Sequence, residues 1–85
     1  MELDEEIRAV LAGSGRLAVD VAAVDRDDDL FALGLDSHGA VELMVALEER
    51  LGVEFPDRLL TRATFRSIAA LAAALAELLP VGARP

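Results

Sequence analysis

The chain has 85 residues, the length of one domain, and a domain of that size buries only about 60–65% of the surface that its unfolded chain exposes. It has no cysteine, which excludes disulfides and Cys/His zinc sites, and no stretch approaches the roughly 20 apolar residues of a membrane span. Its net charge of −8 disfavours nucleic acid and anionic lipid as partners, and the acidic start "MELDEE" is unlike a signal peptide, so we expect a cytoplasmic protein.

The composition favours an all-α domain, because hydrophobic residues make up 54% of the chain and aromatic residues only 4%, with alanine and leucine dominant. The stripe of the first predicted helix consists of Leu3, Ile7, Val10 and Leu11. Acidic residues fill its first turn, where they suit the helix dipole, and it ends near Gly13. Residues 14–35 lack helical periodicity and predict a long loop, packed by its own apolar residues, with a short helical turn around residues 28–33.

A second helix is predicted over residues 37–51 and ends at Gly52. Its apolar stripe is formed by Ala40, Leu43, Met44, Leu47 and Leu51. We expect Leu43, Leu47 and Leu51 in the core.

Pro56 and Asp57 open a short third segment, and Thr64 is the predicted N-cap of the fourth helix, which Pro80 ends. The apolar stripe of that helix is Phe65, Ile68, Ala72, Leu75 and Leu79. Residues 1–80 are therefore expected to form a single domain, and residues 81–85 a frayed C-terminal tail.

Carboxylates at Asp25, Asp27, Asp29 and Asp36 imitate the spacing of a calcium loop. The loop glycine at the sixth position is replaced by Leu30, and the bidentate glutamate at the twelfth is an aspartate. We expect a solvated acidic turn and no metal site.

Ser37 and His38 are neighbours, which raises the question of a hydrolytic site. Adjacent helical side chains diverge by about 100°, so His38 cannot easily serve Ser37 as a base. The chain also has no Cys, Lys, Tyr or second His for acid–base chemistry. We expect no catalytic residue.

Ser37 itself stands at the start of the second predicted helix, where a serine is usually an N-cap. Gly34 permits a turn and Asp36 is already a good N-cap, so Ser37 falls in the first turn of the helix. A phosphate ester there would meet free N–H groups and the positive end of the helix dipole.

The segment "LFALGLDSHGAVELMVALEERLGVEFPD" resembles the part of acyl and peptidyl carrier proteins in which the serine of "G-x-D-S" receives 4′-phosphopantetheine. The resemblance covers roughly residues 25–78, and "D-S-x-G-x-V-E-L" with "L-E-x-R" is nearer to D-alanyl and other aminoacyl carrier proteins. It implies an up-down-down four-helix bundle with a short third helix, in a carrier domain over residues 1–80.

By the same resemblance, a transferase would move phosphopantetheine from coenzyme A to Ser37, and the thiol of the arm would hold an acyl or aminoacyl group as a thioester. The implied partners are that transferase, a loading ligase or acyltransferase, and a downstream synthase. The residues expected to contact partners are Asp36, His38, Glu42, Met44 and Glu48.

Two positions depart from many carriers: His38 stands where leucine is common, and Gly39 costs up to about 1 kcal/mol relative to alanine in a helix. We expect a free-standing, monomeric carrier. The alternatives are an acidic adaptor without a prosthetic group and an enzyme with Ser37 as nucleophile, and the sequence leaves open whether the pathway makes fatty acids, polyketides, peptides or wall polymers.

Overall fold

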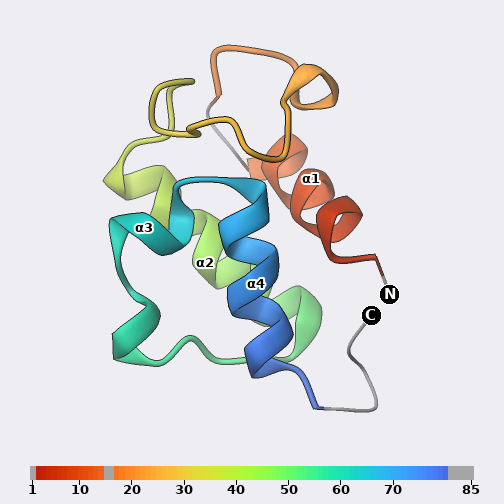
Figure 1. The fold of residues 1–85 in the computed structure, drawn as a ribbon, viewed down its shortest axis with the longest axis vertical. Helices are drawn as coiled ribbons and strands as arrows, with labels where there is room; N and C mark the ends of the chain where they lie inside the picture. Colours follow the sequence, from red (N-terminus) through yellow and green to blue (C-terminus); the bar gives the residue numbers. More distant parts are fainter. Residues whose placement is uncertain (1, 15–16, 81–85) are drawn as a thin grey trace.

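The structure, a computed structural model, describes residues 2–14 and 17–80. These residues form four α-helices and no strand (Figure 1). The helices are α1 (Leu3–Ser14), α2 (Ser37–Leu51), α3 (Arg62–Phe65) and α4 (Ile68–Leu78). Two short 3-10 turns, η1 (Val21–Ala23) and η2 (Asp57–Leu59), lie in the connections. The predicted all-α bundle, with a short third helix and a long first loop, is confirmed. The third segment was expected to open at Pro56 and Asp57, but that stretch forms the 3-10 turn η2, and the third α-helix begins at Arg62.

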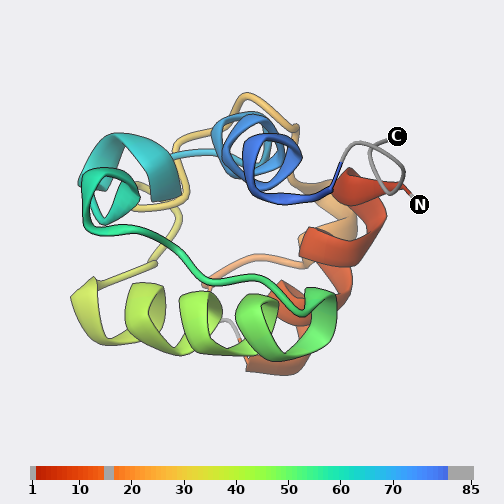
Figure 2. The same cartoon turned by 90° about the horizontal axis from the view of Figure 1, so that it is seen from below.

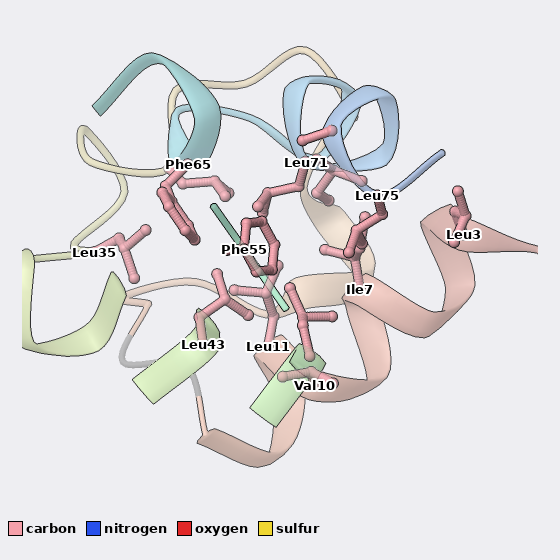
Figure 3. Close-up of a cluster of buried hydrophobic side chains, with 14 of the residues drawn as sticks. Leu3, Ile7, Val10, Leu11, Leu35, Leu43, Phe55, Phe65, Leu71 and Leu75 are labelled. Carbon is pink, nitrogen blue, oxygen red and sulfur yellow. The ribbon is translucent and has the colours of Figure 1, made fainter. Parts of the chain in front are cut away.

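The helices enclose one hydrophobic core. α1 packs against both α2 and α4, and α4 also contacts α3. Figure 2 shows α4 end-on above α2, with α1 on one side and α3 on the other. The largest fully buried side chains are Ile7, Leu11, Leu30, Leu43, Leu47, Ile68, Leu71 and Leu75. Phe55 lies among them (Figure 3), with its ring centroid 5.6 Å from that of Phe65.

The first two helices match the sequence closely. α1 runs one residue past Gly13, and α2 has the predicted bounds. Gly52 ends α2 in the left-handed conformation, at φ +66°, and its N–H donates to the Glu48 carbonyl. Leu43 and Leu47 are buried as expected, whereas Leu51 is only half-buried.

The loop between α1 and α2 is held against the helices by its own apolar side chains and by hydrogen bonds to its backbone carbonyls. Val24, Leu30 and Leu35 are buried, which confirms the packed loop. The Arg8 guanidinium donates from Nη1 to the Val21 and Val24 carbonyls at 3.0 and 2.7 Å. The helical turn expected around residues 28–33 appears as a hydrogen-bonded turn over residues 30–34, displaced by one or two residues.

The start of the fourth helix was predicted wrongly. Thr64 lies inside α3, and its N–H donates to the side chain of Thr61, which is the N-cap of α3. The N-cap of α4 is Ser67, whose Oγ accepts from the Ala70 N–H at 3.0 Å. Phe65 fits an apolar stripe in either helix, so periodicity alone joined two segments that Ser67 separates. The predicted tail, residues 81–85, lies outside the residues that the structure describes.

Candidate functional site

Ser37 is the first residue of α2, and its side chain is exposed. The side-chain cap of this helix is Asp36, whose Oδ1 accepts from the Gly39 N–H at 2.7 Å. Gly34, at φ +117°, makes the preceding turn that a residue with a side chain would adopt only under strain. Turn and cap are therefore supplied by Gly34 and Asp36, and the helix start does not need the Ser37 hydroxyl.

Gly39 is buried under this turn. A Cβ at Gly39 would lie 3.1 Å from Leu35 Cδ1 and 3.3 Å from Asp36 Oδ1. Both distances are tighter than ordinary van der Waals contact, so the missing side chain lets Leu35 and the capping carboxylate approach the helix. The glycine that looked costly in the sequence has a packing role next to Ser37.

Ser37 opens onto a hollow of about 380 Å³ between α2 and the segment that leads into α3. Ser37, Val41 and Met44 of α2 form one wall, and Phe31, Leu60 and Phe65 form the other. In Figure 2, α3 lies across from the first turns of α2. Val41 and Leu60 are 56% and 46% exposed, so the apolar surface continues to the rim. We call this space the Ser37 hollow.

An arginine borders the Ser37 hollow at its α3 side. Arg62 is the first residue of α3, and its guanidinium carbon lies 3.9 Å from the centroid of the Phe31 ring. This is a cation–π contact, and the Arg62 side chain otherwise remains exposed. Arg62, Phe31 and Leu60 were not among the predicted site residues. The sequence did offer an indication for Leu60, because it is one of two adjacent leucines in the short polar segment "DRLLTR". The contact of Arg62 with Phe31 has no such indication, because it depends on tertiary packing.

Three of the predicted partner-contact residues lie together at the Ser37 end of α2. His38 and Glu42 are paired, with 2.8 Å between His38 Nε2 and Glu42 Oε1. This contact directs the His38 imidazole along α2 rather than toward Ser37, which argues against a Ser–His catalytic pair. Asp36 caps the helix beside them.

The other two predicted contact residues are partly enclosed. Met44 is half-buried in the wall of the Ser37 hollow. Glu48 lies about three turns along α2 from Ser37, is half-buried, and accepts the Phe55 N–H on Oε2 at 2.8 Å. Glu48 therefore joins α2 to the segment after it, in addition to any contact with a partner.

The acidic loop uses its carboxylates for its own turns. Asp25 Oδ1 accepts from the Asp27 N–H at 3.0 Å, and Asp29 Oδ1 accepts from the Phe31 N–H at the same distance. Within residues 2–14 and 17–80, no group of three or more His, Asp or Glu side chains could hold a metal ion. In the same part of the chain, no helix is long and apolar enough to cross a membrane.

Comparison with known proteins identifies the family to which the chain belongs. The family described as "Phosphopantetheine attachment site" matches residues 5–75. The aminoacyl carrier protein of Agrobacterium fabrum is 42% identical over 69 residues, which cover 81% of this chain and 83% of that protein. The acyl carrier protein of Helicobacter pylori, strain G27, is 48% identical over 58 residues, which cover 67% of this chain and 72% of that protein.

Among solved structures, the chain is similar to a carrier protein from Agrobacterium tumefaciens. That protein was crystallised in complex with an engineered glycine:[carrier protein] ligase of Bradyrhizobium japonicum and ATP. The TM-score is 0.87 with 38% sequence identity, and the match covers 91% of this chain and 100% of that chain. The chain thus belongs to the phosphopantetheine attachment-site family and is a carrier protein of the acyl-carrier fold.

Proposed function

We propose that Ser37 is the attachment site of 4′-phosphopantetheine in this carrier, and that the cargo is an amino acid. The observation that supports the attachment site most strongly is the exposed Ser37 side chain, beside the hollow and with its structural task taken over by Asp36. When attached, the group would supply a thiol at the end of a flexible arm, on which cargo forms a thioester.

The residues around Ser37 fit such a group. The N–H groups of the first turn of α2, together with the helix dipole, favour negative charge at Ser37, where the phosphodiester would be placed. The apolar walls of the Ser37 hollow offer the arm a surface beside its point of attachment. Apart from the Ser37 hydroxyl, which is the acceptor in the transferase reaction, no residue of this chain need act as acid, base or nucleophile, because partner enzymes perform the chemistry and the carrier raises the effective concentration of the cargo.

The proposal of an amino-acid cargo rests on the relatives. An aminoacyl carrier protein is 42% identical to this chain, and a carrier of the same fold forms a complex with a glycine:[carrier protein] ligase. We therefore propose an amino-acid:carrier ligase as the loading partner, a phosphopantetheinyl transferase that modifies Ser37, and a downstream enzyme that accepts the cargo. Asp36, His38, Glu42 and Met44 lie at the cap and in the first two turns of α2 and are the proposed contacts, with Glu48 further along α2.

The attachment is tested by incubating the protein with coenzyme A, Mg²⁺ and a promiscuous phosphopantetheinyl transferase. Intact-mass and peptide mass spectrometry should find one phosphopantetheine, on the peptide that contains Ser37, and none on Ser37→Ala. A wild-type protein that stays unmodified would support the acidic adaptor instead. Acylation of Ser37 without coenzyme A would support the enzyme with a serine nucleophile.

The cargo is tested on the modified protein with ATP, a glycine:[carrier protein] ligase and a panel of amino acids. We expect an aminoacyl thioester that hydroxylamine releases and that Ser37→Ala does not form. A protein that resists this ligase but accepts fatty acyl groups from an acyl-ligase would be an acyl carrier, like the Helicobacter pylori relative.

A further inference from the structure

Arg62 differs from the other arginines of the described ranges in what holds it. Arg58, four residues before Arg62, pairs with Glu77 at 2.9 Å. Arg66, four residues after it, pairs with Asp29 at 3.6 Å. The remaining guanidiniums are held by carboxylates or carbonyls: Arg8 on Val21 and Val24, Arg26 on Asp4, and Arg50 on Glu6. The Arg62 guanidinium lies over the Phe31 ring instead.

A cation–π contact keeps the guanidinium in place without neutralising it. The contact orients the charge over an aromatic face, and the N–H donors at the edge of the guanidinium can still meet an anion. Arg62 is exposed and borders the same hollow as Ser37, on the opposite wall. A positive charge held on an aromatic ring thus borders the hollow onto which Ser37 opens.

The charge of the surroundings makes such a cation useful. A phosphodiester on Ser37 would add a negative charge next to the Asp36 carboxylate, in a chain whose net charge is already −8. The nearby His38 is paired with Glu42. Among the residues that border the hollow, Arg62 is the one with a cationic side chain.

We propose that Arg62, held on the Phe31 ring, is the counter-ion of the phosphodiester on Ser37 and positions the base of the arm over the hollow. This inference rests on the proposed attachment at Ser37 and assigns Arg62 a binding role toward the prosthetic group. Because guanidinium presents paired N–H donors, it suits the two free oxygens of a phosphodiester better than a lysine would.

Nuclear magnetic resonance of the arginine side chains tests the contact directly. The protein is labelled with ¹⁵N-arginine, and the Nε–Hε resonances are compared before and after modification, with Arg62→Gln to assign the Arg62 signal. We expect the Arg62 signal to shift on modification and the Arg58 signal to stay in place. An Arg62 signal that does not move, in protein that mass spectrometry shows to be modified, would overturn the inference and leave the attachment site intact.

Thermal unfolding separates this role from a purely structural one. Loss of the Arg62–Phe31 contact in Arg62→Gln lowers the Tm of the unmodified and modified proteins alike, whereas loss of a phosphodiester contact lowers only the Tm of the modified protein. We expect Arg62→Gln to lower the Tm of the modified protein more than that of the unmodified one. Arg62→Lys should lower the Tm of the modified protein less than Arg62→Gln does.

The matched control Arg58→Gln, which removes an equal charge, should affect both forms equally. Equal losses for Arg62→Gln in the two forms would contradict the proposal, and failure of the transferase to modify Ser37 would overturn both it and the proposed function.

Discussion

At the scale of single residues, the start of α2 depends on the Asp36 carboxylate. Asp36→Ala removes the acceptor of the Gly39 N–H and should lower the free energy of unfolding by about 1 kcal/mol. Asp36→Asn, which caps nearly as well, should restore most of that loss. Urea unfolding of the three proteins measures the difference, and an Asp36→Ala variant as stable as wild type would show that the helix start is held by something else.

Glu48 is the second residue whose role the structure sharpens. Glu48→Ala leaves the N–H of buried Phe55 without its acceptor, and we expect a loss of about 1–3 kcal/mol. Its neighbour Glu49 is exposed, so Glu49→Ala is a matched control that should change the stability by less than about 0.5 kcal/mol. Equal effects of the two substitutions, measured by urea unfolding, would contradict a structural role for Glu48.

At the scale of the helix, substitutions at two glycines distinguish the low helix propensity of glycine from the effect of packing around it. Gly13 in α1 has open space where a Cβ would stand, so Gly13→Ala should raise the free energy of unfolding by about 0.5–1 kcal/mol. Gly39→Ala meets Leu35 and the capping Asp36 instead, and it should gain less than Gly13→Ala or lose stability. A larger gain at Gly39 than at Gly13 in the same unfolding experiment would contradict the packing role.

The sequence predicted elements well where local signals agree. For α2, the apolar stripe, the Asp36 cap and Gly52 all give the same bounds, and the structure has them. At the fourth helix the signals conflict, because Thr61, Thr64 and Ser67 are all cap candidates. Only the structure shows that Thr61 and Ser67 are the caps and that α3 and α4 are separate helices.

The candidate site likewise has one part that local sequence signals predict and one part that depends on tertiary packing. Ser37 and its cap lie in one short stretch, so the sequence could predict them together. The opposite wall of the Ser37 hollow comes from Leu60 and Phe65, and its position depends on packing of the Phe65 ring near Phe55. Such contacts between distant segments have no local signature, which is why Arg62 could not be predicted.

At the scale of the whole molecule, ion pairs join segments that are distant in the sequence. Asp4 of α1 accepts two hydrogen bonds from the Arg26 guanidinium, at 2.8 and 3.2 Å, and the Arg26 carbonyl accepts the Ala69 N–H of α4. The hydrogen bond from Arg26, assisted by its charge, lowers the pKa of the Asp4 carboxyl below its usual value. The loop is thereby held to both flanking helices.

This pair predicts a pH dependence. Because the pKa of Asp4 is lower in the folded state, its contribution is complete above the unfolded pKa of about 3.9 and is lost as the pH falls through the folded pKa. The stability difference between wild type and Asp4→Asn should therefore shrink as the pH is lowered from about 6 to about 3. Arg26→Gln should reproduce this behaviour, and a difference that grows toward acid pH would contradict it.

We propose that this carrier holds an amino acid through a phosphopantetheine arm on Ser37, and that the helical bundle presents this arm to its partners. Tandem mass spectrometry of the protein purified from its native host tests this proposal, because one spectrum reports both the modified residue and the cargo. We expect a phosphopantetheine on the Ser37 peptide and an ejected pantetheine fragment whose mass includes an amino acid. An unmodified Ser37, or an arm that carries only fatty acyl groups, would contradict it.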